Sequence, residues 1–288
     1  MSLVVRFSRL PRPLARRLLP VLRYFNLMRA LELRLMAPWV RDAAGWRVLD
    51  VGCGPGPYTL DLARRGATLI GCDLLPEPLS VARRTTRDLG LDGQAHFAEA
   101  NASALPVSAE QFDLVVCNCV LEHVDDDGAA LAGMARALRP GGILCLTVDN
   151  AEGELAFTLL DRLSPSAKER LLWPQVSAAP TVLHGLRALL DERYSVLRRY
   201  LHDELIRSLE ELGLTILESS PYLTGIGAAH HEAFHALRIL DPSRKIGRLF
   251  YMISSLLFYP LAAWSDSRRG AQGHGLAIVA RKKVGSSP

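Results

Sequence analysis

The stretch VLDVGCGPG at residues 48–56 joins a short apolar run to three glycines at every second position, Gly52, Gly54 and Gly56. The apolar residues are typical of a strand buried on both faces. The glycines let the backbone turn tightly and pass close to a ligand, because no Cβ stands in the way. A helical pattern follows over 57–65. A strand, a glycine turn and a helix in this order predict a nucleotide-binding crevice.

A second unit strengthens this interpretation. The β-like run at 68–72 ends at Asp73, about 20 residues beyond the glycine turn, where an acidic side chain can accept hydrogen bonds from ribose hydroxyls. The alternative is that Asp73 only begins a turn and caps the following helix. A pyridine-nucleotide dehydrogenase is disfavoured, because its glycines follow G-x-G-x-x-G whereas these follow G-x-G-x-G.

Apolar runs alternate with helical patterns along most of the chain. Such alternation predicts an α/β fold with a doubly wound, mostly parallel sheet that binds ligands at the carboxyl ends of its strands. The runs lie at 48–51, 68–72, 113–117, 143–148, 214–217 and 275–280, and the helical patterns at 57–65, 77–88, 128–138 and 203–212.

These motifs, in this order, resemble the class I S-adenosylmethionine-dependent methyltransferases, in the broad group that includes the ubiquinone and menaquinone biosynthesis methyltransferases. The matching segments are VLDVGCGPG at 48–56, GCD at 71–73, NASALP at 101–106, FDLVVCNCVLEHV at 112–124, LRPGGILCLTV at 138–148, and the units at 198–219 and 275–282. The resemblance implies a seven-stranded Rossmann-like sheet with S-adenosyl-L-methionine as cofactor.

The resemblance also implies roles for residues that follow the strands. Asp50 would orient the glycine turn, whose backbone would contact the methionine part of the cofactor. Asp73 would hold the ribose, and Leu74 beside it belongs to the same site. Asn101 and Ala102 would lie beside the adenine. The family usually has aspartate at position 101, but an asparagine carbonyl can still accept from the adenine amino group.

Methyl transfer from a sulfonium needs mainly the alignment of a nucleophile with the methyl carbon. Asn118 falls where family members line the methyl-donor pocket; for Asn118, as for Asn101, simple turn chemistry is the alternative. An oxygen nucleophile also benefits from a base of near-neutral pKa, and His123 in LEHV is the candidate. A packing role is the alternative for His123.

One motif points to different chemistry. Residues 231–235 read HEAFH, which matches the zinc-binding HExxH pattern of many metalloproteases. A zinc protease is a remote alternative, because the cofactor motifs already account for the sheet and no motif marks a third ligand. An acid/base or metal role within a methyltransferase is the second interpretation for His230 and His231, and simple lining of an insertion is the third. No metal ligand is assigned.

Composition and motifs divide the chain into six parts. Hydrophobic residues make up 49% of the chain and the net charge is +4, so a sizeable core is expected. The parts are a basic amphipathic helical arm or lid (1–44), a cofactor-binding core (45–150), an insertion that shapes the acceptor pocket (151–197), a core helix and strand (198–219), a hydrophobic insertion (220–273), and the last strand and tail (274–288). Five cysteines without a CxxC spacing suggest reduced thiols and a cytoplasmic or equivalent compartment.

Residues 1–22 and 246–264 predict a peripheral membrane contact. Nine arginines stand before residue 45 against Glu32 and Asp42, with leucines between them, as in helices at anionic membrane surfaces. The alternative for the arm is a helical lid docked on the sheet with its arginines in water. The run at 246–264 is shorter than the roughly 20 residues of a spanning helix and contains Pro260, so a buried helix and a pocket wall are its alternatives.

Location and partners follow from the same composition. The expected place is the cytoplasm, at the inner face of a membrane, although a mitochondrial transit peptide has a similar composition. Nucleic-acid binding is disfavoured, because leucine and proline rather than aromatic residues lie between the arginines.

The sequence therefore predicts O-methylation of a hydrophobic small molecule such as a quinol, a lipid or a natural product. C- or N-methylation is the nearest alternative. A cofactor-binding module that presents a membrane or partner surface without turnover belongs to a different class and is also kept. Neither motif nor periodicity identifies the acceptor or the oligomeric state.

Overall fold

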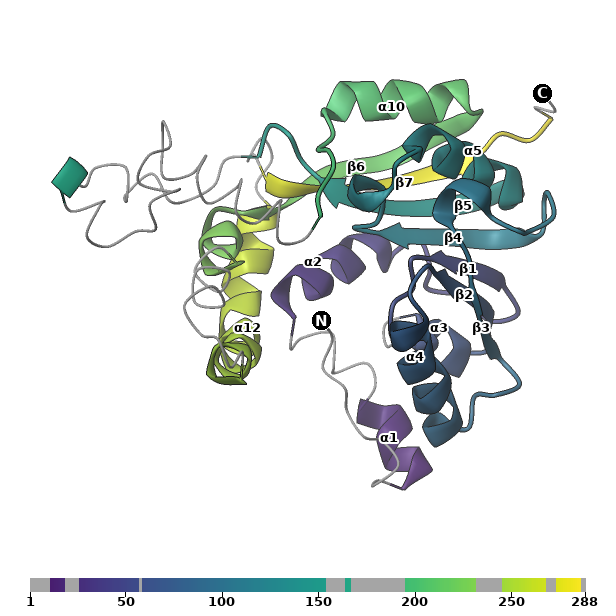
Figure 1. The fold of residues 1–288 in the computed structure, drawn as a ribbon, viewed down its shortest axis with the longest axis horizontal. Helices are drawn as coiled ribbons and strands as arrows, with labels where there is room; N and C mark the ends of the chain where they lie inside the picture. The colour runs from purple at the N-terminus through teal and green to yellow at the C-terminus, as the bar shows by residue number, and fades with distance from the viewer. Residues whose placement is uncertain are drawn as a thin grey trace.

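The computed structural model describes residues 11–18, 26–56, 59–153, 164–166, 195–231, 245–267 and 273–285. Its centre is a seven-stranded sheet of order β3-β2-β1-β4-β5-β7-β6 (Figure 1). The strands are β1 (Arg47–Val51), β2 (Thr68–Asp73), β3 (Ala95–Glu99), β4 (Phe112–Asn118), β5 (Leu138–Asp149), β6 (Leu214–Thr224) and β7 (Gly273–Lys282). The helices are α1 (Arg12–Leu18), α2 (Leu27–Met36), α3 (Leu60–Arg64), α4 (Pro76–Leu89), α5 (Asp127–Ala137), α10 (His202–Glu211) and α12 (Lys245–Asp266), with 3-10 turns η3 (Ala102–Ala104) and η4 (Leu121–His123).

The sheet is mostly parallel, as predicted. Strands β1 to β5 pair in parallel, and β7 is antiparallel to both β5 and β6. The register sets Asn118 opposite Thr147, and Asp149 opposite Gly275. The ends of β1 and β2 are likewise in register with the end of β4. The ends of β1, β2, β4 and β5 and the start of β7 therefore meet at one edge of the sheet. We call this the carboxyl edge.

Helices cover both faces of the sheet (Figure 1). On one face, Leu131 of α5 and Leu205 of α10 share a core cluster with Leu49 and Leu146 of the sheet. On the other face, a second cluster includes apolar residues of α1, α3 and α4. A third cluster joins α2 and α12 to β6 and β7 through Leu31 and the ring of Tyr222. Burial of these apolar side chains is the main force that holds the layers together.

Most predicted elements lie within two residues of the observed bounds. Strand β5 begins at Leu138, five residues before the predicted run, and α3 begins at Leu60, three residues after the start of the predicted helix. Strand β3 (AHFAE) has no apolar run, because it is an edge strand with exposed positions. Strand β6 continues to Thr224, so the predicted division between residues 219 and 220 falls inside a strand. A helix at 225–231 follows it. The predicted insertion at 151–197 lies mostly outside the described residues.

The described part of the N-terminal arm is docked on the core. The guanidinium of Arg16 donates to the backbone oxygens of Leu89 and Gly90, both at 2.7 Å, at the C-terminus of α4. Helix α2 is capped by Asn26, whose side chain accepts from the Arg29 N–H. The buried face of α2 lies on the sheet and on α12. Both described helices of the arm are thus docked on the core, and Arg16, Arg29 and Arg34 bind protein groups rather than water alone.

Among the described residues, no helix has the length and apolarity required to cross a membrane.

Candidate active site

The glycine turn after β1 forms the first half of the site. Gly52 and Gly54 both have positive φ, at 67° and 52°. A Cβ at Gly52 would overlap the side chain of Val120, whereas a Cβ at Gly54 would meet nothing within 4 Å. The turn thus packs against the loop after β4 on one side and leaves space on the other. That space beside Gly54 fits a ligand that approaches the backbone closely.

Asp73 fastens the glycine turn to the end of β2. Its Oδ2 accepts from the Gly54 N–H at 2.8 Å, and its Oδ1 accepts from the Leu75 N–H at 2.9 Å. Helix α4 begins after Leu75, and no side chain caps it, so Asp73 is not a helix cap. Each carboxylate oxygen keeps a second lone-pair direction, which can take a ribose hydroxyl. Leu74, next to Asp73, is 62% exposed.

Asp50 lies behind the turn and is buried. Thr59 donates its hydroxyl to Asp50 Oδ2 at 2.6 Å, and this bond joins the end of β1 to the start of α3. Burial raises the pKa of Asp50 to about 7, although the Thr59 bond and Arg29 oppose the rise. The contacts of Asp50 fit the predicted role of orienting the turn. Thr59 was not predicted, since its role depends on a buried partner nine positions away.

Asn101 and Ala102 follow β3. The Asn101 side-chain oxygen accepts from the Ser103 N–H at 3.0 Å and caps the 3-10 turn η3, in which Ala102 is buried. This is the turn chemistry named as the alternative for Asn101. The contact does not use up the oxygen, which has two lone pairs. The predicted adenine contact therefore stays a prediction.

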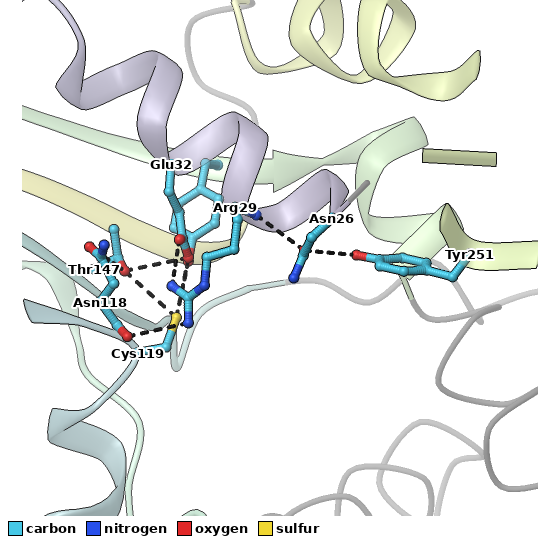
Figure 2. A network of polar contacts seen from close by, with 8 residues as sticks. Asn26, Arg29, Glu32, Asn118, Cys119, Thr147 and Tyr251 are labelled. Atoms are coloured by element: carbon cyan, nitrogen blue, oxygen red, sulfur yellow. Dashed lines mark hydrogen bonds and ion pairs between the residues drawn. The ribbon is translucent and has the colours of Figure 1, made fainter. Parts of the chain in front are cut away.

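A buried polar network lies where α2 crosses the carboxyl edge (Figure 2). At its centre is Glu32, which has no exposed surface. Glu32 Oε1 accepts from the Tyr222 hydroxyl at 2.7 Å, from Cys119 Sγ at 3.3 Å and from Thr147 Oγ1 at 3.4 Å. Glu32 Oε2 pairs with Arg29 at 2.5 Å. We call Arg29, Glu32, Cys119, Thr147 and Tyr222 the α2 network.

The α2 network reaches Asn118, the predicted methyl-donor residue. Arg29 donates to the Asn118 backbone oxygen at 3.4 Å, and the Asn118 side-chain oxygen lies 3.5 Å from Thr147 Oγ1. The Arg29 side chain is 20% exposed, so its remaining N–H groups can meet an anion such as the carboxylate of the methionine part. Sequence reasoning missed Arg29. The sequence feature that could have indicated Arg29 is the spacing of three residues to Glu32, with which it forms an ion pair on α2.

Glu122 is a further carboxyl buried at this edge. It belongs to η4, directly after β4, and is 1% exposed. Neither of its carboxyl oxygens has a hydrogen-bond partner among the described residues. Burial and then the charge of Asp149 raise the pKa of Glu122 to about 8. Sequence reasoning passed over Glu122 in favour of its neighbour, His123.

The predicted catalytic histidines lie in different places. His123 is exposed, and its Nδ1 lies 3.1 Å from the Ser195 backbone oxygen. His230 stacks on Tyr251 at 5.2 Å with Nε2 2.7 Å from Ser254 Oγ, and burial lowers its pKa. These contacts tie His230 to α12.

His231 is buried, and its ring lies 5.3 Å from that of His274. His274 Nε2 in turn lies 4.0 Å from Asp149 Oδ1 at the carboxyl edge. The remaining residues of the HExxH match, 232–235, lie outside the described residues. Within the ranges that the structure describes, no group of three or more His, Cys, Asp or Glu side chains could hold a metal ion.

Comparison with known proteins assigns a family to part of the chain. Residues 49–146 match the model of the methyltransferase domain family. A ubiquinone biosynthesis O-methyltransferase from Aeromonas salmonicida (strain A449) is 40% identical over 118 residues, which are 39% of this chain and 48% of that protein. This chain spans about half the length of such curated relatives.

Two solved structures show the extent of the shared fold. A geranyl diphosphate methyltransferase in complex with S-adenosylmethionine has a TM-score of 0.56 at 15% identity, over 86% of this chain and 83% of that one. The [4+2]-cyclase SpnF has a TM-score of 0.55 at 21% identity, over 88% and 82%. At these identities the likeness concerns the fold alone.

Proposed function

Because this chain carries a class I S-adenosylmethionine-dependent methyltransferase domain, we propose that it methylates a hydroxyl group of a hydrophobic small molecule such as a quinol. The cofactor of this domain is S-adenosylmethionine, which supplies a methyl group already activated on a sulfonium. The observation that carries the proposal is the hydrogen bond from the Gly54 N–H to Asp73. This bond holds the glycine turn at the carboxyl edge, with open space beside Gly54.

The residues of this edge would have different roles. The glycine turn and Asp73 would bind the cofactor, and the Asp50–Thr59 bond would keep the turn in place. Asn118 and the α2 network would close the methionine end, with Arg29 as the cation for a carboxylate. Such fixed groups favour a reaction that depends mainly on alignment.

Two observations support a hydrophobic acceptor with a hydroxyl. The curated relatives are named for ubiquinone biosynthesis and for transfer to oxygen. The buried carboxyl of Glu122 lies at the same edge and can accept the proton that an oxygen nucleophile must lose. Carbon and nitrogen nucleophiles are the alternative acceptors.

A cofactor-binding module without methyl transfer is the alternative from another class. One finding supports this alternative: the [4+2]-cyclase shares the fold, and its name describes a different reaction. Calorimetry with S-adenosylmethionine and transfer of a tritiated methyl group to a hexyl-substituted catechol separate the two. We expect binding and labelled product. Binding without transfer to the catechol, or to amine and carbon-acid probes, would favour the module.

We also propose that the protein works at an anionic membrane surface on the cytoplasmic side. Helix α12 exposes large apolar side chains at spacings of three and four residues, on one helical face: Phe250, Ile253, Leu257, Leu261 and Trp264. An exposed apolar face of this extent marks an interaction surface.

Flotation with vesicles that contain phosphatidylserine tests the membrane proposal. Wild type should float, and Leu257→Asp with Leu261→Asp should not. A chain without residues 1–22 separates the share of the arm from that of α12. If the double variant floats like wild type, α12 is not the contact.

A further inference from the structure

We propose that Glu122 is the base that takes the proton of the acceptor hydroxyl; this inference rests on the proposed transfer to oxygen. In the proposed reaction the glycine turn and Asp73 bind and align the cofactor, and neither exchanges a proton with the acceptor. Glu122 differs from them in position, in burial and in its lack of partners.

The position of Glu122 is set by β4. Strand β4 ends at Asn118, and the chain then turns into η4, which places Glu122 four residues past the strand end at the carboxyl edge. The Glu122 backbone oxygen accepts from the Leu197 N–H at 2.7 Å, which fixes η4 against the segment before α10. The side chain is thus held by a rigid element, as a base must be to meet a substrate proton.

An unpartnered buried carboxyl calls for an explanation. Glu122 is 1% exposed, and neither of its oxygens has a hydrogen-bond partner within the described part of the chain. Buried polar groups in native proteins are nearly always paired, and the exceptions gather at functional sites. A hydroxyl of a bound acceptor would supply the missing partner.

Charges from two elements act on Glu122. Asp149 at the end of β5 and Glu32 on α2 disfavour its ionised form, whereas its own backbone N–H and Arg29 on α2 favour it. The thiols of Cys117 and Cys119 also lie within electrostatic range. Burial, with Asp149 and Glu32, raises the pKa of Glu122 to about 8. A carboxyl with a pKa near the working pH is an effective general base, whereas an ordinary glutamate is too weak.

The other candidates at this edge are less suited to the task. Glu32 already accepts from three donors and an arginine. His123 is exposed, and its Nδ1–H donates to the Ser195 oxygen. The base is therefore the residue before the histidine that the LEHV motif suggests.

The Glu122 carboxylate takes the hydroxyl proton while an oxygen lone pair of the acceptor forms the bond to the methyl carbon. The carbon–sulfur bond breaks, its electron pair stays on sulfur, and the sulfonium charge is neutralised. Glu122 then holds one proton, which it returns to water before the next turnover.

The test compares Glu122→Gln with wild type and with Glu211→Gln, a control on an exposed carboxyl at the end of α10. Infrared spectra of each protein, titrated from pH 5 to pH 10, report protonated carboxyls. We expect a band in wild type that disappears above about pH 8, that Glu122→Gln lacks, and that Glu211→Gln keeps. The cofactor affinity, measured by calorimetry, should be the same in all three proteins.

Turnover is then measured with the hexyl-substituted catechol as acceptor. We expect kcat of wild type to rise with pH up to about pH 8, and Glu122→Gln to lose about 100-fold or more together with this rise. Glu122→Asp should regain part of both. If Glu122→Gln keeps the wild-type kcat or pH profile, or if its infrared spectrum equals that of wild type, the inference is overturned. If wild type itself does not turn over, the proposed function fails instead.

Discussion

The two halves of the carboxyl edge are built in opposite ways. In the glycine-turn half, the polar partners are close in sequence: Gly54 and Asp73 are 19 positions apart, and Asp50 and Thr59 are nine. In the half under α2, Glu32 meets Cys119 across 87 positions and Tyr222 across 190. The first half is a local unit of a strand, a turn and a helix. The second half exists only when distant elements pack together.

Because of this difference, the glycine-turn half should serve mainly cofactor binding, and the half under α2 should serve mainly the packing of distant elements. The local half can form its hydrogen bonds with β1, β2 and the start of α3 alone. The α2 network buries a carboxylate and an arginine that need each other, so it requires α2, β5 and β6 to be in place at once. Substitutions in the two halves should therefore differ in kind, with loss of stability in one and loss of cofactor affinity in the other.

Glu32→Ala should give the largest effect and sharpen the comparison. Removal of one partner of a buried ion pair leaves Arg29 and the Tyr222 hydroxyl unsatisfied, which costs about 3–5 kcal/mol in the free energy of unfolding. Urea denaturation measures this loss. Tyr222→Phe removes a single donor and should cost about 1 kcal/mol. Glu211→Ala is the exposed control and should change little. Equal stabilities of Glu32→Ala and Glu211→Ala would show that the network does not hold α2.

Asp73→Ala should give the second-largest effect, which is a loss of affinity for the cofactor. It removes the acceptor for the Gly54 and Leu75 N–H groups and for the ribose, so we expect about a 100-fold weaker Kd for S-adenosylmethionine. Calorimetry measures the Kd, and urea denaturation should show a smaller loss of stability than for Glu32→Ala. Asp61→Ala, which lies on α3 and pairs with arginines there, is the matched control. A wild-type Kd in Asp73→Ala would refute the ribose assignment.

The same contrast explains what could be predicted from the sequence. The glycine turn, Asp73 and the order of strands follow from short-range patterns, so β1, β2 and β4 were found with bounds close to those observed, whereas β5 begins five residues before its predicted start. Strand β3 was missed because AHFAE lies at the sheet edge and lacks an apolar run. The end of β6 was missed because a polar stretch, ESSP, continues a strand that its apolar residues only begin.

The candidate site was predicted only in its local half. Arg29 and Glu32 stand in a segment that reads as a basic arm, and nothing local indicates that Glu32 is buried against Tyr222. In LEHV, histidine drew attention because its ordinary pKa suits a base. The fold instead buries Glu122 and exposes His123. Burial, which decides which of two adjacent side chains can act, is a property of the packed edge and not of the motif.

Per pH unit and per group, the pH dependence of stability gives the smallest effect, and it compares the halves directly because each buries one carboxyl of raised pKa. Asp50 titrates at about 7 and Glu122 at about 8, against ordinary values of 3.8 and 4.5. The folded protein therefore binds protons that the unfolded chain releases, so stability should fall as the pH rises from about 4 to 8, by up to about 1.4 kcal/mol per pH unit for each group. Asp50→Asn should flatten the fall below pH 7, and Glu122→Gln should flatten it up to pH 8. Urea denaturation at each pH measures both slopes. A fall that Glu122→Gln leaves unchanged between pH 7 and 8 would mean that Glu122 is already ionised in the folded protein at pH 7, and that burial in the half under α2 does not raise its pKa to about 8.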